Sequence, residues 1–104
     1  ARAVARAREL APDKPIEVEV ETLDELAQAL AAQADRIMLD NFSEQDLREA
    51  LSLSRQATVE LEVSGNIDKG GLSQRASSGL DFISIGALTK HCQAVDFSMR
   101  ITHR

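Results

Sequence analysis

The chain has few of the residues on which several protein classes depend. It contains no tryptophan or tyrosine and a single cysteine, Cys92, among its 104 residues. One cysteine excludes an internal disulfide framework and a cysteine-based zinc site, and it fits a reducing compartment. No apolar run approaches the ~20 residues of a membrane span, and no signal-peptide core is visible. We therefore expect a cytoplasmic chain without a membrane partner.

Positive charge is also scarce. Lys+Arg number 12 against 17 Asp+Glu, which gives a net charge of −5 and no dense basic run. This balance argues against nucleic acid as a partner. With 43% hydrophobic and 28% charged residues, the composition is that of one globular domain. The chain opens with Ala1 and enters a helical pattern at once, so we expect it to be part of a longer protein.

The remaining residues alternate between helical and strand periodicity. Apolar residues at helical spacing predict helices that end at Pro12, run over 23–34, follow Ser43, and extend from about Lys69 to Gly79. Apolar runs and strict alternation predict strands over 16–21, 36–39, 58–63 and 82–85, with a short extended piece over 97–101.

The strand ends recur at a regular period. Glu19, Asp40, Ser64 and Gly86 follow one another at intervals of 21, 24 and 22 residues. Strand, helix and strand at this spacing predict right-handed βαβ units and a parallel sheet, either doubly wound or part of a barrel. Four strands cannot close a barrel, which usually takes eight. The barrel reading is therefore an α/β fold with about half of a TIM-like (β/α) barrel, its strands adjacent in chain order and its helices on one face.

The first predicted strand carries charge where a buried parallel strand should be apolar. Glu17, Glu19 and Glu21 project to one face of this strand, opposite its isoleucine and valines. The strand is then either a sheet edge with a wet outer face or a barrel strand whose carboxylates face the barrel interior. In the second case the carboxylates need a cation to offset the cost of burial.

Polar or small residues end the other strands, where parallel α/β proteins bind their ligands. Asp40 directly follows Ile37–Leu39, Ser64-Gly65-Asn66 follows the third strand, and Gly86 closes the fourth. Small residues let backbone N–H groups approach a phosphate, and carboxylates beside them favour Mg²⁺ with a phosphorylated substrate. The histidines, His91 and His103, lack a second ligand at metal spacing.

Four segments in this order resemble one enzyme family. They are Ile16–Glu21 (IEVEVE), Ile37–Phe42 (IMLDNF), Leu61–Asn66 (LEVSGN) and Asp81–Lys90 (DFISIGALTK). Together they resemble the C-terminal part of quinolinate phosphoribosyltransferase, the carboxylating nicotinate-nucleotide pyrophosphorylase. The resemblance implies that residues 1–104 are the C-terminal part of the α/β-barrel catalytic domain, without the N-terminal domain and early barrel strands.

The resemblance implies a glycosyltransferase of the pentosyltransferase class. The reaction converts quinolinate and 5-phosphoribosyl-1-pyrophosphate into nicotinate mononucleotide, CO₂ and pyrophosphate, in NAD biosynthesis. By motif position, Glu19 and Asp40 resemble the carboxylates that face the ribose and Mg²⁺-pyrophosphate, and Ser64, Gly65, Asn66 and Gly86 the residues that hold the 5′-phosphate. Lys90 falls where some relatives carry histidine. The resemblance also implies a homo-oligomer, a dimer or hexamer, and an isolated fragment without activity.

Two other functions remain open at this point. A paralogous phosphoribosyltransferase-like barrel would use a different acceptor base. A receiver-type signalling module would accept phosphate on Asp40 and contact it through Lys90, but receivers need an acidic pair after their first strand. Here the carboxylates of Glu17, Glu19 and Glu21 lie within the strand.

Overall fold

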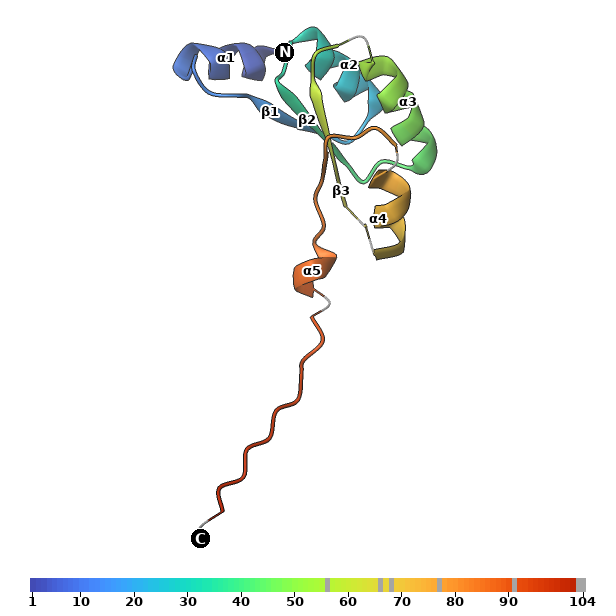
Figure 1. The fold of residues 1–104 in the computed structure, drawn as a ribbon. Helices are drawn as coiled ribbons and strands as arrows, with labels where there is room; N and C mark the ends of the chain where they lie inside the picture. Colours follow the sequence, from blue (N-terminus) through green and yellow to red (C-terminus); the bar gives the residue numbers. More distant parts are fainter. Residues whose placement is uncertain (56, 66, 68, 77, 91, 103–104) are drawn as a thin grey trace.

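The computed structural model describes residues 1–55, 57–65, 67, 69–76, 78–90 and 92–102. Four parallel strands form one sheet in the order β1-β2-β3-β4, and helices alternate with them along the chain (Figure 1). The elements are α1 (Arg2–Leu10), β1 (Glu17–Val20), α2 (Leu23–Ala31), β2 (Arg36–Asp40), α3 (Glu44–Ser54), β3 (Glu60–Ser64), α4 (Lys69–Ala76), β4 (Phe82–Ile83) and α5 (Ala87–Lys90).

The strand order decides between the two architectures that the sequence allows. β1 pairs with β2, β2 with β3 and β3 with β4, and every pairing is parallel. Helices α2, α3 and α4 all lie on the same face of the sheet (Figure 1). Sequential strand order with helices on one face is the arrangement of a barrel wall, whereas a doubly wound sheet carries helices on both faces. The prediction of a four-stranded barrel portion is confirmed.

The helices begin at the residues that the sequence indicates. The Thr22 hydroxyl accepts a hydrogen bond from the Glu25 N–H, and the Ser43 hydroxyl accepts one from the Asp46 N–H, so each caps its helix. The helix faces pack against alternate strand residues in one apolar core, whose fully buried members include Leu26, Ile37, Leu39 and Val63. Burying such a side chain contributes about 1.5–3 kcal/mol, so this face holds the sheet to its helices.

Two aspartates tie strands together at their amino ends. The Asp35 carboxylate, just before β2, accepts a hydrogen bond from the Ile16 N–H at 2.8 Å, and the Asp81 carboxylate, just before β4, accepts one from the Leu61 N–H at 2.8 Å. Each aspartate therefore binds the backbone of the preceding strand. Periodicity gives no sign of these contacts, because their partners are 19 and 20 residues away in the chain.

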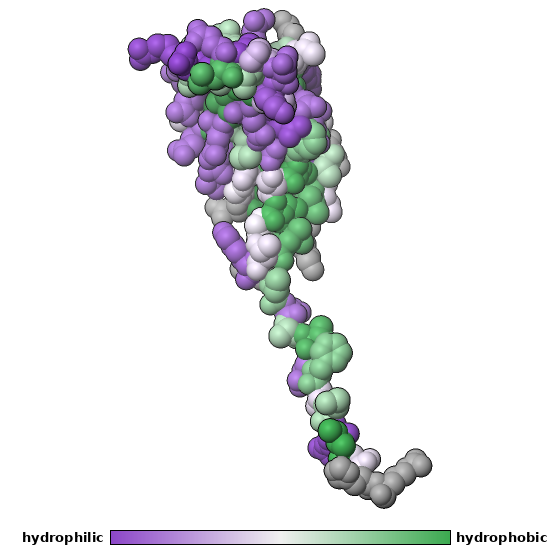
Figure 2. Space-filling model, turned by 90° about the vertical axis from the view of Figure 1, so that its left-hand side faces the viewer, coloured by the Kyte–Doolittle hydropathy of each residue, from purple (hydrophilic) through white to green (hydrophobic). Residues whose placement is uncertain are grey.

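The structure differs from the sequence prediction near the C-terminus. β4 has only two residues, and residues 92–102 contain no strand although the chain there is extended. The alternating apolar residues of this tail (residues 92–102) are exposed, from 73% for Val95 to 88% for Phe97, and Figures 1 and 2 show the tail running away from the body. Within the described residues no neighbouring strand lies beside the tail, so its alternation does not produce a ladder. No described helix has the length and apolar character needed to cross a membrane.

Candidate active site

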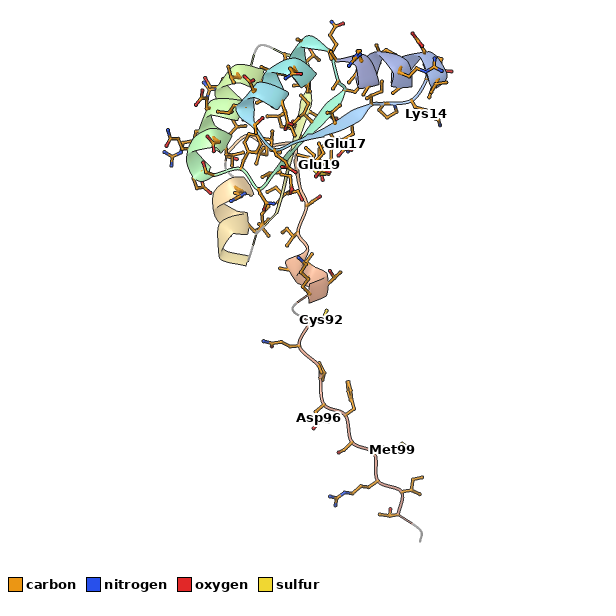
Figure 3. All side chains as sticks on the ribbon, turned by 180° about the vertical axis from the view of Figure 1, so that it is seen from behind. Lys14, Glu17, Glu19, Cys92, Asp96 and Met99 are labelled. Carbon is orange, nitrogen blue, oxygen red and sulfur yellow. The ribbon has the colours of Figure 1, made fainter. Side chains whose placement is uncertain are left out.

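The sheet face opposite the helices carries the polar side chains. Strand residues alternate between faces, and the register aligns Glu19 with Met38 and Met38 with Glu62. Figure 3 shows Glu17 and Glu19 on the same side of β1. We call this helix-free surface the inner face; its strand residues are Glu17, Glu19, Arg36, Met38, Asp40, Glu60, Glu62, Ser64 and Phe82. The glutamates of β1 thus belong to a barrel interior.

Three carboxylates meet at the carboxyl ends of β1 and β2. One oxygen from each of Glu19, Glu21 and Asp40 lies within 4.8 Å of the other two. The two glutamates are exposed and Asp40 is half-buried. The Asn41 side-chain amide donates to Asp40 Oδ2 at 3.2 Å. The sequence puts Glu21 on the same face as Glu19, but only Glu19 and Asp40 are predicted as site residues. The structure adds Glu21 to their cluster.

No cation within the described part of the chain forms an ion pair with these three carboxylates. Lys14 precedes β1 and lies beyond Glu17, at the other end of the strand from Glu21 (Figure 3). Like charges held this close repel one another, and an ion such as Mg²⁺ prefers the hard oxygen ligands that they offer. The composition of the cluster therefore fits a magnesium ion better than a soft transition metal.

The β3 end forms a tight turn against the β2 end. Gly65 adopts φ +85°, and a Cβ added there would lie 2.3 Å from the Asn41 Oδ1. The Asn41 N–H also donates to the Ser64 carbonyl at 3.2 Å. Only glycine satisfies both the left-handed backbone and the close approach. The predicted phosphate loop therefore lies directly beside Asp40 and Asn41; Asn66, also predicted there, lies outside the described residues.

Gly86 follows β4 and begins the turn into α5. A Cβ at Gly86 would lie 3.6 Å from Cε and 3.9 Å from Nζ of Lys90, so the lysine side chain lies over the glycine. The Lys90 N–H donates to the Gly86 carbonyl at 3.0 Å, which closes this single helical turn. The family resemblance gives Lys90 as a position where some relatives carry histidine, and the receiver-type alternative gives it a contact with phosphate. The structure brings its ammonium to the predicted phosphate-binding glycine.

Arg36 organises the opposite, amino end of the inner face. Its guanidinium donates to Glu60 Oε2 from Nε at 3.0 Å and from Nη2 at 2.7 Å, and Glu17 Oε2 lies 3.8 Å from Nη1. The same guanidinium lies 3.9 Å from the centre of the Phe82 ring. The hydrogen bond to Glu60, together with the charges of Glu60, Glu17 and Glu62, raises the pKa of Arg36 against the opposing effect of desolvation. Arg36 stands between Asp35 and the apolar run Ile37–Leu39, and nothing in the sequence indicates this role.

The sequence that forms these strand ends matches a known family. The family model of the quinolinate phosphoribosyl transferase C-terminal domain matches residues 1–100. The chain belongs to this family. The family resemblance recognised in the sequence is thereby confirmed, and the receiver-type alternative is not favoured.

Individual relatives carry consistent names. The chain is 42% identical to a probable carboxylating nicotinate-nucleotide pyrophosphorylase of Methanocaldococcus jannaschii, over 95% of this chain and 38% of that protein. It is 36% identical to the human carboxylating nicotinate-nucleotide pyrophosphorylase, over 96% and 35%. The solved nicotinate-nucleotide pyrophosphorylase of Francisella tularensis superposes with a TM-score of 0.81 at 54% identity, over 91% and 34%. The chain spans about a third of the length of these relatives.

Proposed function

We propose that this chain supplies the phosphoribosyl-binding part of a carboxylating nicotinate-nucleotide pyrophosphorylase. This enzyme is a pentosyltransferase that converts quinolinate and 5-phosphoribosyl-1-pyrophosphate into nicotinate mononucleotide, CO₂ and pyrophosphate. The observation that carries the proposal is the meeting of three carboxylates and two glycine turns at adjacent strand ends. Residues 1–104 would be the C-terminal part of the catalytic barrel.

The carboxylates suit the charge that develops in such a reaction. Departure of pyrophosphate leaves positive charge on the ribose, and a fixed anion stabilises that charge in the transition state. Glu19 lies on the inner face and is free of any ion pair in the described part of the chain, so its charge is available to the sugar. Asp40, oriented by Asn41, would accept a hydrogen bond from a ribose hydroxyl and so align the sugar.

A magnesium ion fits the same cluster. Glu19 and Asp40 would hold it, with Glu21 as a third oxygen donor. When bound, the ion offsets the negative charge of the leaving pyrophosphate. Without the ion, the three carboxylates repel the phosphates of the substrate, so the cluster alone would oppose binding.

The glycine turns suit the 5′-phosphate. Gly65 and Gly86 carry no side chain, so their backbone amides can approach a phosphate closely, and Lys90 adds a positive charge above Gly86. Quinolinate, a dianion, needs a cationic pocket that the described inner face does not offer, because Arg36 is already bound by Glu60. We place that pocket in the N-terminal domain, the early barrel strands and a partner subunit of a homo-oligomer.

A hybrid enzyme tests the proposal. In this hybrid, the 104 residues replace the corresponding third of the Francisella tularensis enzyme, and its fold is checked by circular dichroism. We expect release of labelled CO₂ from carboxyl-labelled quinolinate that depends on 5-phosphoribosyl-1-pyrophosphate and Mg²⁺. The 104-residue chain alone should show no turnover and only weak binding of phosphoribosyl compounds. A folded hybrid without activity, or an isolated chain as active as the parent enzyme, would contradict the proposal.

A further inference from the structure

The strand that leads to Gly86 is weakly held by its backbone. β2 and β3 are aligned over five residue pairs, but β3 and β4 over only two, Glu62 with Phe82 and Val63 with Ile83. Past these pairs toward Gly86, one further backbone hydrogen bond joins the described residues of the two strands, from the Ser84 N–H to the Val63 carbonyl at 2.9 Å. At the opposite end of the pairing, the Asp81 N–H donates to the Leu61 carbonyl at 3.0 Å. Short pairing of this kind leaves the end of β4 free to open locally.

A side-chain contact strengthens this junction. The Ser84 hydroxyl donates a hydrogen bond to Glu62 Oε1. Glu62 is 8% exposed, and its negative charge also raises the pKa of the Arg36 guanidinium on the neighbouring strand. A buried carboxylate is unfavourable without a partner, so the hydroxyl of Ser84, just beyond β4, stabilises the Glu62 carboxylate.

The position of this contact relates it to the proposed phosphate cradle, which consists of the turns at Ser64–Gly65 and at Gly86. Glu62 lies two residues before Ser64, and Ser84 lies two residues before Gly86. The hydrogen bond therefore joins the two strands that lead into the cradle, and its two residues precede their turns by the same number of positions. Two groups that contact the same ligand bind it tightly only when the protein already holds them at the right separation.

We propose that Ser84 is a positioning residue, which acts through Glu62 to hold Gly86 at the separation from Ser64–Gly65 that one phosphate requires. This role rests on the proposed function of the two turns as a phosphate cradle. Ser84 itself does not need to touch the phosphate. Its removal should weaken phosphate binding while the Glu19, Glu21 and Asp40 cluster keeps its affinity for Mg²⁺.

The test uses the 104-residue chain and amide NMR titrations with ribose 5-phosphate and, separately, with Mg²⁺. Ser84→Ala should raise the Kd for ribose 5-phosphate about fivefold, the equivalent of one ordinary hydrogen bond, and leave the Kd for Mg²⁺ unchanged. Ser84→Thr, which keeps the hydroxyl, should restore binding. Ser78→Ala is the matched control, because that exposed hydroxyl donates to the Arg75 carbonyl outside the site.

Amide hydrogen exchange provides a readout that needs no ligand. Ser84→Ala and Glu62→Met, each of which removes one partner of the hydrogen bond, should both accelerate exchange of the backbone amide at position 84, and Ser78→Ala should not. Unchanged exchange in both variants overturns the proposal, as does unchanged ribose 5-phosphate affinity in Ser84→Ala. Equal losses of ribose 5-phosphate and Mg²⁺ affinity also overturn it, because they indicate general loosening. If the unmodified chain binds no ribose 5-phosphate, the proposed function of the two turns as a phosphate cradle fails. Hydrogen exchange at position 84 then decides by itself whether the Ser84–Glu62 hydrogen bond holds the two strands together.

Discussion

Among the described residues, the carboxylates at one end of the inner face are paired with a cation, and those at the other end are not. At the amino ends of the strands, Arg36 binds Glu60, approaches Glu17 and stacks on Phe82. At the carboxyl ends, Glu19, Glu21 and Asp40 share a small space without a described cation to pair with. The charges of the first arrangement are paired within the chain, and those of the second are the ones that we propose a ligand completes. The comparison separates residues that hold the strands together from residues that we propose bind a ligand, a division that barrel enzymes generally show.

The largest expected effect is the loss of the carboxyl-end charges. In the hybrid enzyme, Glu19→Ala and Asp40→Ala should each lower kcat on the order of 10²-fold or more, because each removes a fixed negative charge from the developing cation. Glu21→Ala, at the rim of the same cluster, should have a smaller effect. Cys92→Ala serves as the control, since the thiol is exposed on the tail. Rates near that of the unmodified hybrid in both Glu19→Ala and Asp40→Ala would refute the assignment.

The turn at Gly65 should be the position most sensitive to an added methyl group. Gly79→Ala places a side chain at φ +92° in open space and should destabilise the chain by about 1–2 kcal/mol. Gly65→Ala has the same backbone cost and also collides with Asn41, which adds about 1–3 kcal/mol. Urea unfolding of both variants measures the difference. Equal destabilisation would mean that the contact with Asn41 carries no energy.

Removal of the amino-end cation should affect stability and leave binding unchanged. Arg36→Met keeps a long apolar side chain over Phe82 but leaves Glu17 and Glu60 without their shared partner. We expect the Tm to fall by a few degrees, with Mg²⁺ and ribose 5-phosphate affinities unchanged. Thermal unfolding followed by circular dichroism, together with the NMR titrations, checks both parts. A large change in Mg²⁺ affinity would show that the two ends are not separate.

The smallest effect is expected in the tail. Phe97 is 88% exposed, so Phe97→Ser removes almost no packing and should change the free energy of unfolding of the 104-residue chain by less than about 0.5 kcal/mol. Urea unfolding of the variant beside the unmodified chain measures this. A loss above 1 kcal/mol would indicate that the side chain packs against the body in solution.

Local patterns in the sequence predict most of the sheet and its helices, but few of the side-chain contacts between strands. Strand alternation, the helix start at Ser43 and the regular period of strand ends are properties of neighbouring residues, and they lead to the correct strand order. Arg36 looks like one polar residue beside an apolar run, because its partners Glu17 and Glu60 come from other strands. The hydrogen bonds of Asp35 and Asp81 to neighbouring strands, and that between Ser84 and Glu62, are not predicted either, because their partners also come from other strands. Alternation in the tail predicts the extended chain that the structure shows there, but a paired strand also requires a neighbour.

The contact between Gly65 and Asn41 constrains how this chain can change over evolutionary time. Both residues occupy left-handed backbone, with φ +85° and 54°, and the space of a Cβ at one is filled by the amide of the other. A larger residue at position 65 is then tolerated only after position 41 has lost its long side chain, and that loss removes the amide that binds Asp40. Substitutions at the two positions are therefore coupled, and position 41 has to change before position 65. The first step removes the hydrogen bond to Asp40 and so disturbs the carboxylate cluster.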